Sequence, residues 1–308
     1  MSNELQRLSD YAHSTFLEYL KFNCLQDSVD KIIFIDRDCF FLFSLWQKDP
    51  IDLLIPGEYL VTNRAILNKI YLENVESREK KYIDKFFENI SNIAIVDIGW
   101  TGKSKQLIEK ICGQKFQAYF FGIHKKNDLS IKSLFRRSRI GKFIGETELL
   151  EHIFTAPYPQ ATHVYGNKYS PIVERHEIDH ENLDEFFFLQ RRFAEFRMRP
   201  MKSILWSKIV IKALTYKILI FPTWETIVEF KYTKHSVVPG ELRKIPLVNF
   251  FIEKEQDRIL FPFWNLRVVF NFRIGHEIHR GKLLLGFLSI YAHQLCTKIG
   301  KTLRVYAK

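Results

Sequence analysis

The chain has 308 residues, of which 46% are hydrophobic, and this is enough to bury one large core or a core with a smaller appendage. Its formal charge of +11 favours anionic partners such as nucleic acid, acidic lipid head groups or phosphorylated sugars. The four cysteines form no CxxC pair, the N-terminus is polar, and no run of about 18 apolar residues is present, which argues against a zinc site, a signal peptide and a membrane-spanning helix.

The first half of the chain alternates helical and strand patterns. Apolar residues at helical spacing over 8–25 predict an amphipathic helix. Short apolar runs predict buried strands at 31–36, 57–63, 92–97 and 117–122. Helical patterns at 64–90 and 103–111 separate these strands. The alternation predicts an α/β fold, a Rossmann-like three-layer arrangement of a parallel sheet with helices on both faces.

The pattern becomes less regular beyond residue 130. Further helices are predicted at 146–155, 181–200, 201–221 and 281–308. The segment 157–176 contains Pro and Gly and is interpreted as a loop with short strands. We therefore expect an α/β core over residues 1–130 and a mostly helical, partly irregular C-terminal region over 131–308 that packs on this core.

Acidic side chains stand at the ends of two predicted strands. Asp36 and Asp38 follow the first strand, and Asp97 ends the third. Because ligands bind beyond the carboxyl ends of parallel strands, we expect these acids to share one site. The first acid of an Asp-x-Asp pair can attack phosphorus, the second can protonate the leaving group, and all three can hold Mg²⁺. The alternative is structural, because Asp at a strand end often caps a turn.

A second set of residues is expected to bind phosphoryl oxygens. Hydroxyl and amide groups at a neighbouring strand end can donate hydrogen bonds to them, and a glycine-rich turn before a helix offers backbone N–H groups. These criteria select Thr62, Asn63, Arg64, Gly99, Gly102 and Lys103. Together with the three acids, they predict a phosphate-handling site at the edge of the sheet.

Five motifs also carry a resemblance to a known family. They are Phe-Ile-Asp-Arg-Asp-Cys at 34–39, Tyr-Leu-Val-Thr-Asn-Arg at 59–64, Val-Asp-Ile-Gly-Trp-Thr-Gly at 96–102, Leu-Leu-Glu-His-Ile-Phe-Thr-Ala-Pro at 149–157 and Phe-Pro-Thr-Trp-Glu at 221–225. The sequence resembles the haloacid-dehalogenase-like (HAD-like) proteins associated with bacterial surface-polysaccharide biosynthesis, most specifically at 96–102. It departs from them at Cys39, where Gly is usual, and at Thr62-Asn63, which replaces a Ser-Arg pair.

The resemblance implies a hydrolase-type protein of capsule or O-antigen biosynthesis. Asp36 would be the nucleophile and Asp38 the general acid of a Mg²⁺-dependent phosphohydrolase or phosphotransferase acting on a sugar phosphate. The alternative is a non-catalytic accessory protein that binds a lipid-linked glycan precursor or a glycosyltransferase. Either protein is expected in the cytoplasm, or at the inner face of the membrane as a peripheral protein.

The positive charge is concentrated in the second half. The predicted helix at 201–221 carries Lys202, Lys208, Lys212 and Lys217 among Ile, Leu and Trp residues, and 281–308 has a similar character. Such basic, apolar helices can contact a membrane surface or pack on the core with solvated lysines, and both interpretations stay open. Nucleic-acid binding is not expected, because the basic residues follow no known nucleic-acid-binding motif.

Overall fold

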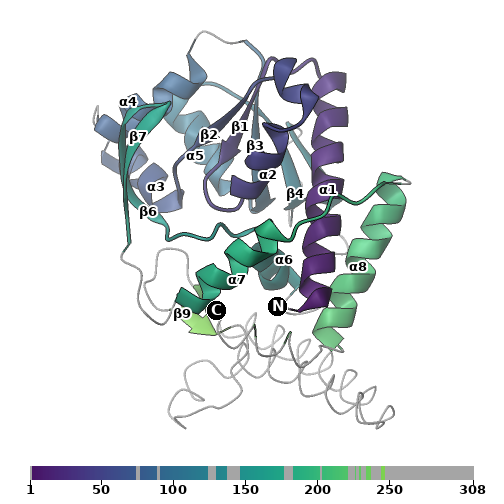
Figure 1. Ribbon diagram of the computed structural model, residues 1–308. Helices are drawn as coiled ribbons and strands as arrows, with labels where there is room; N and C mark the ends of the chain where they lie inside the picture. The colour runs from purple at the N-terminus through teal and green to yellow at the C-terminus, as the bar shows by residue number, and fades with distance from the viewer. Residues whose placement is uncertain are drawn as a thin grey trace, which may run out of the picture.

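Figure 1 shows the protein as a computed structural model. The described residues are 2–73, 77–88, 91–123, 130–136, 146–176, 183–201, 203–220, 226, 229, 234–236 and 244–246. The predicted helix at 281–308, the motif at 221–225 and Lys202 lie outside the described residues.

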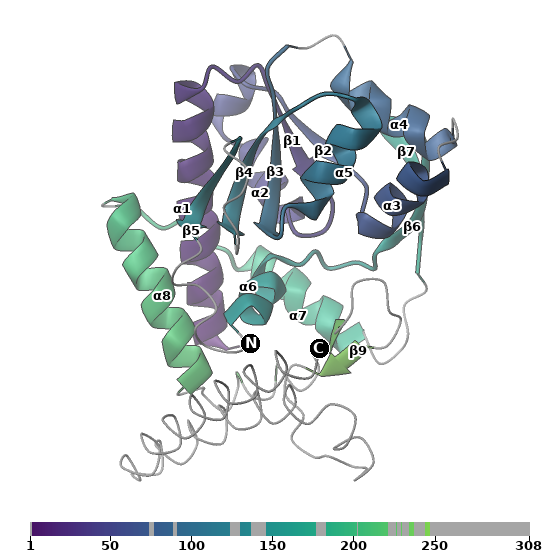
Figure 2. The same cartoon turned by 180° about the vertical axis from the view of Figure 1, so that it is seen from behind.

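Five parallel strands form the central sheet, in the order β2-β1-β3-β4-β5 (Figure 2). They are β1 (Lys31–Ile35), β2 (Gly57–Leu60), β3 (Ile93–Trp100), β4 (Gln117–Ile123) and β5 (Ile131–Arg136). The expected α/β, Rossmann-like arrangement is therefore confirmed. The fifth strand starts directly after residue 130, so the sheet continues into the segment that the sequence analysis assigned to the C-terminal region.

Apolar side chains of the strands alternate between two cores, one on each face of the sheet. In β1, Ile32 and Phe34 belong to one core and Ile33 and Ile35 to the other. Parallel strands that are covered on both faces need apolar residues at successive positions, which explains the unbroken apolar run over 32–35.

Helices cover both faces (Figure 2). The described helices are α1 (Asn3–Gln26), α2 (Phe40–Trp46), the 3₁₀ helix η1 (Pro50–Leu53), α3 (Arg64–Glu73), α4 (Arg78–Phe87), α5 (Lys103–Cys112), α6 (Glu146–Phe154), α7 (Leu183–Ala194) and α8 (Ile204–Ile220). Residues of α1, α2, α6 and α8 form one core with the sheet, and those of α3, α4 and α5 form the other. The sheet and its two helical layers thus make the expected three-layer arrangement.

The single helix predicted over 64–90 is wrong, because two helices occupy this segment. Helix α3 ends at Glu73, and α4 begins at Arg78. Ser77 caps the second helix, since its hydroxyl accepts a hydrogen bond from the backbone N–H of Lys80 at 3.0 Å. The helical pattern over 64–90 was therefore interpreted as one helix, although Ser77 starts a second one.

The segment expected to be a loop with short strands is a β-hairpin. Strands β6 (Ala161–Asn167) and β7 (Ser170–Arg175) pair in antiparallel fashion. We call residues 155–176 the arm, because they leave α6 and lie against α3 and α4 (Figure 2). A second antiparallel pair is formed by β8 (Lys234–Ser236) and β9 (Lys244–Pro246).

A buried ionic cluster joins parts of the second half that are far apart in sequence. The Arg192 guanidinium in α7 donates to His152 Nε2 in α6 at 3.0 Å and to the Glu229 carboxylate. Burial alone would raise the pKa of Glu229, but the positive charge of Arg192 is the main cause that lowers it to about 2. The cluster therefore fixes α6, from which the arm departs, relative to α7.

Helix α8 has one buried and one exposed side. Ile211 and Ile218 contact the core with α1, whereas Leu205, Trp206 and Ile209 are more than half exposed. Within the described part of the chain, no helix combines the length and apolarity needed to cross a bilayer.

His13 of α1 lies in a fully buried aromatic environment. Its ring contacts Phe41, Phe154, Phe193 and Phe196, with centroids 4.3–6.1 Å apart. The ring Nδ1 is 2.9 Å from the Ser9 carbonyl oxygen, which can only accept, so Nδ1 carries the proton of a neutral imidazole. Burial is the main cause that lowers the pKa of His13 to about 3.

This burial predicts a pH-dependent stability. In the unfolded chain His13 titrates at 6.5, so between pH 6.5 and about 3 the unfolded state binds the extra proton. Because of His13, we expect the free energy of unfolding to decrease by about 1.4 kcal/mol for each pH unit as the pH falls through this window. Urea unfolding of the wild type and of His13→Phe at pH 6, 5 and 4 should show a shallower pH dependence for the variant.

The matched control is Phe196→Leu, which loosens the same aromatic cluster and keeps the histidine. It should lower stability by a similar amount at every pH and retain the wild-type slope. Parallel pH curves for the wild type and His13→Phe would contradict the assignment of a neutral His13.

Candidate functional site

The end of β1 places two carboxylates on either side of a tight turn. The backbone N–H of Asp36 still bonds to the Leu60 carbonyl oxygen at 2.9 Å, so Asp36 is held in line with the sheet. Arg37 then adopts a left-handed conformation with φ of 64°, and the N–H of Asp38 bonds to the Asp36 carbonyl oxygen at 3.0 Å. Helix α2 begins two residues later, at Phe40.

The Asp36 carboxylate is buried and held by three side chains. Its Oδ1 accepts hydrogen bonds from the hydroxyls of Tyr59 at 2.6 Å and Tyr158 at 3.1 Å, and the two hydroxyls also contact each other. Its Oδ2 lies 3.5 Å from Nη1 of Arg175. Only 1% of the Asp36 side chain is exposed, so the arm closes the approach to this carboxylate.

Asp38 and Asp97 share the electrostatic environment of Asp36. Burial raises the pKa of Asp38 to about 6, and the negative charges of Asp97 and Asp36 act in the same direction against Arg37 and Arg64. Burial also raises the pKa of Asp97, against the positive charge of Arg64. The sheet therefore brings the three predicted acids to one place, which we call the carboxyl edge (Asp36, Asp38, Thr62 and Asp97).

The residues after β2 have different roles. Thr62 is buried, and its hydroxyl has no hydrogen-bond partner among the described residues. Asn63 caps α3, since its Oδ1 accepts from the N–H groups of Ala65 and Ile66, and its Nδ2 donates to the Ala161 carbonyl oxygen of the arm at 2.6 Å. Asn63 thus has a structural function, whereas the Thr62 hydroxyl is free to meet a ligand.

Arg64 lies between two parts of the predicted site. Its Nη2 donates to the Thr101 hydroxyl at 3.2 Å, which joins the start of α3 to the turn after β3. Lys103 is the first residue of α5, and its side chain is exposed. The described structure therefore positions Arg64 near the acids and leaves Lys103 in solvent.

The glycines of the 96–102 motif answer steric demands. Gly99 has φ of +100°, and a Cβ atom there would lie 2.4 Å from the Gly122 carbonyl oxygen in β4. Gly102 caps α5 with φ of +69°. Trp100 between them also has a positive φ of 64°, so this turn is backbone-strained for a non-glycine residue. The turn leads into the N-terminus of α5, as the sequence predicted.

Three buried polar atoms near the carboxyl edge have no hydrogen-bond partner among the described residues: Asp36 Oδ2, Arg37 Nε and Thr62 Oγ1. Buried polar atoms in native proteins are nearly always paired, so such groups call for a ligand, an ion or water. Their occurrence next to Asp36 indicates a site that is completed by a bound polar molecule.

Sequence reasoning missed Tyr59, Tyr158 and Arg175. Tyr59 is the first residue of the 59–64 motif, and Tyr158 follows the 149–157 motif directly. Their positions beside these motifs could have indicated both as site residues. Arg175 offered none, because it reaches Asp36 only through the fold of the arm.

The described residues contain no group of three or more His, Cys, Asp or Glu side chains that is arranged to hold a metal ion. Carboxylates are suitable ligands for Mg²⁺, and Asp38 and Asp97 supply two. The third, Asp36, directs Oδ1 at two tyrosine hydroxyls and Oδ2 at a guanidinium. Asp36 would therefore have to exchange these partners before it could ligate a cation.

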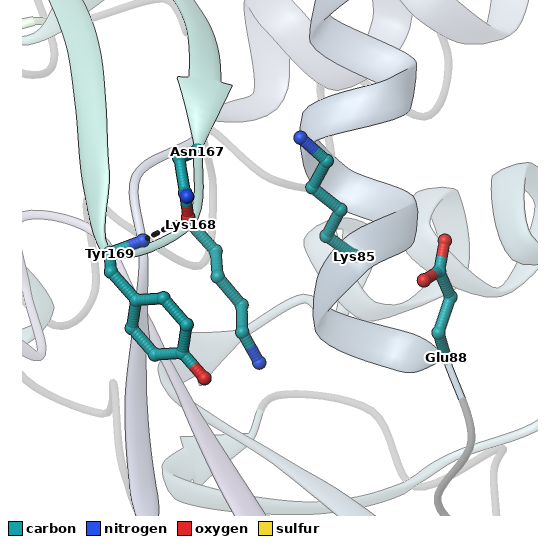
Figure 3. A pocket seen from close by; sticks show the side chains of 5 residues that line it. All are labelled: Lys85, Glu88, Asn167, Lys168 and Tyr169. Carbon is teal, nitrogen blue, oxygen red and sulfur yellow. Dashed lines mark hydrogen bonds between the residues drawn. The ribbon is translucent and has the colours of Figure 1, made fainter.

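An open hollow elsewhere is lined by Lys85, Glu88, Asn167, Lys168 and Tyr169 (Figure 3). It lies between the end of α4 and the turn of the arm. Phe86, next to Lys85 at the end of α4, accepts a hydrogen bond from Lys31 at the start of β1. The hollow therefore lies near the starts of the strands, whereas Asp36 follows the end of β1. It is distinct from the carboxyl edge.

No family model matches the sequence, and no curated protein matches it. The resemblance to HAD-like proteins therefore stays a prediction from the five motifs. Among the described residues the site gathers buried carboxylates, nearby arginines and a buried hydroxyl without a hydrogen-bond partner, which are groups able to bind anions or transfer protons.

Gly99 provides a test of the strained turn. Gly99→Ala should destabilise the fold by roughly 2–4 kcal/mol, because it adds the cost of a left-handed non-glycine residue to a backbone clash with β4. The free energy of unfolding in urea is the measurement.

Gly113→Ala is the matched control. Gly113 also has a positive φ of +70°, but a Cβ atom there would meet nothing within 4 Å, so only about 1 kcal/mol should be lost. Equal losses in the two variants would show that contact with Gly122 does not constrain the turn.

Proposed function

We propose that this chain is a HAD-like phosphohydrolase or phosphotransferase that acts on a sugar phosphate in bacterial surface-polysaccharide biosynthesis. The observation that carries the proposal is the carboxyl edge, where Asp36, Asp38 and Asp97 meet beside buried polar atoms that lack partners. Parallel α/β sheets bind ligands at this edge. The five motifs of the sequence supply the family and the polysaccharide context.

The proposed reaction uses the two acids of the β1 turn. An oxygen of the Asp36 carboxylate forms a bond to phosphorus while the bond from phosphorus to the sugar oxygen breaks, and Asp38 donates its proton to that oxygen. Water, or an acceptor hydroxyl in a phosphotransferase, then forms a bond to phosphorus while the bond from phosphorus to Asp36 breaks, and the Asp38 carboxylate takes up the proton of the attacking group. A pKa raised to about 6 suits Asp38 to proton transfer near neutral pH.

The remaining residues of the site would bind the phosphoryl oxygens. The unpaired Thr62 hydroxyl can donate to one of them, and Arg64 supplies positive charge near Asp38 and Asp97. Asp97 would ligate Mg²⁺, which would neutralise charge on the phosphoryl group, while Asp38 carries the proton for the leaving group. Asn63 keeps the arm and α3 in place.

Replacing the nucleophile tests the reaction. Asp36→Asn keeps the size of the side chain and removes its charge, so turnover of sugar phosphates should fall by on the order of 10⁴-fold. The measurement is phosphate release from a panel of sugar phosphates with Mg²⁺ present.

Asp84→Asn on α4 is the control, since Asp84 pairs with Lys80 on the helix surface. It should leave turnover unchanged. Full activity in Asp36→Asn, or no turnover of any phosphoester by the wild type, would contradict the enzymatic proposal.

The exposed side of α8 favours a second function, that of a membrane-surface accessory protein. Leu205, Trp206 and Ile209 are 71%, 53% and 51% exposed, and Lys208 and Lys212 lie on the same helix, which carries no acid. Exposed apolar side chains with nearby lysines suit an anionic membrane surface. Such a protein would bind a lipid-linked glycan precursor or a glycosyltransferase there, without turnover.

Binding to vesicles tests this function. Replacing Leu205, Trp206 and Ile209 together by Ser should weaken co-sedimentation with anionic phospholipid vesicles by at least about tenfold, because three apolar side chains no longer enter the interface. The control replaces three apolar residues that are exposed elsewhere: Leu53, Leu54 and Leu72. Equal binding by both triple variants would rule out α8 as the contact.

A further inference from the structure

The arm reaches the carboxyl edge through two side chains. Tyr158 precedes β6 and donates to Asp36 Oδ1, and Arg175 ends β7 and faces Asp36 Oδ2. They stand 17 residues apart in the sequence, and the hairpin brings them to the same carboxylate. The arm thus supplies one wall of the proposed site.

The position of Arg175 is set by the arm itself. Its Nη1 donates to the Pro159 carbonyl oxygen at 2.8 Å, and its guanidinium lies over the Tyr158 ring, 4.2 Å from the centroid. These contacts hold the planar group in place without any help from Asp36. Without a bound anion, the arm therefore keeps the guanidinium beside Asp36.

The contact between Arg175 and Asp36 is incomplete. At 3.5 Å it lies beyond normal hydrogen-bond distance, and Asp36 Oδ2 accepts no hydrogen bond from the described residues. Within the same part of the chain, Arg175 Nε and Nη2 donate to no protein group. A guanidinium binds an oxyanion best through two parallel hydrogen bonds, and here it makes none with the carboxylate.

The rest of the arm is attached elsewhere. Lys85 donates to the Gly166 carbonyl oxygen, Lys168 pairs with Glu58, and His163 lies 3.1 Å from Glu79. These contacts fix the hairpin on α4 and β2 and do not depend on Arg175. The side chain of Arg175, a quarter of which is exposed, can therefore change partner while the hairpin stays in place.

We propose that Arg175 is an anion-binding residue of the Asp36 site, which pairs with the carboxylate when the site is empty and moves to the phosphoryl oxygens of a phosphomonoester when one enters. This movement frees Asp36 Oδ2, the oxygen that lacks a hydrogen bond. The inference rests on the proposed function, because it takes a phosphate group as the anion.

The test is equilibrium binding of inorganic phosphate to the full chain, measured by calorimetry at neutral pH. Arg175→Met should bind phosphate about 10–100-fold more weakly than the wild type, because it loses charge-assisted hydrogen bonds. Arg175→Lys keeps the charge and should fall between the two, and it serves as the second variant if Arg175→Met does not fold. Arg191→Met is the control, since Arg191 pairs only with Glu195 on the surface of α7.

The outcomes separate this inference from the proposed function. Equal phosphate affinity in Arg175→Met and the wild type, or no phosphate binding by the wild type, overturns the role of Arg175. Weaker binding by Arg175→Met with unchanged binding by Arg191→Met supports it, even if no phosphoester is turned over and the enzymatic proposal fails. If turnover depends on Asp36 but phosphate affinity is the same in the wild type and in Arg175→Met, the enzymatic proposal is supported and the role of Arg175 is rejected.

Discussion

The Asp36 carboxylate joins three parts of the molecule at one buried point. It follows β1, accepts a hydrogen bond from Tyr59 of β2, and meets Tyr158 and Arg175 of the arm. A buried charge is costly unless hydrogen bonds and an opposite charge compensate it. Here Tyr59 of the neighbouring strand supplies part of the compensation, and the arm, more than 100 residues away, supplies the rest. The strand, its neighbour and the arm must therefore fold together for this charge to be tolerated.

The arginines near the carboxyl edge show how a strongly basic protein accommodates a cluster of buried acids. The negative charges of Asp97 and Asp36 help to raise the pKa of Asp38, whereas Arg37 and Arg64 lower it, and Arg175 lies 3.5 Å from the Asp36 carboxylate. Arg37 lies in the turn after β1 and Arg64 begins α3 after β2, whereas the third arginine comes from the arm. The balance of charge is thus assembled from both halves of the chain, which suits a site that exchanges partners when an anion binds.

Elements with strong local signals were predicted well. The run over 32–35 is apolar at every position because both faces of the sheet are covered, and the turn at 99–102 needs glycine where β3 and β4 approach closely. The break between α3 and α4 was missed, because the segment 64–90 was interpreted as helical throughout. A single serine, Ser77, marks the start of the second helix. The role of Asn63 was also missed, since its partner Ala161 lies 98 residues away.

The parallel α/β sheet and its acids could be predicted from the sequence, because hydrophobic periodicity and the residues beside a strand are local properties of the chain. Asp97 was expected to end the third strand, but β3 continues to Trp100, so this acid lies inside the strand. The groups that face the acids follow from packing between segments that are far apart in the chain. Tyr158 and Arg175 reach Asp36 because the hairpin of the arm packs on α4, and no spacing in the sequence encodes that contact. The acids could be identified from the sequence, whereas the side chains that cover Asp36 are brought there by packing between distant segments.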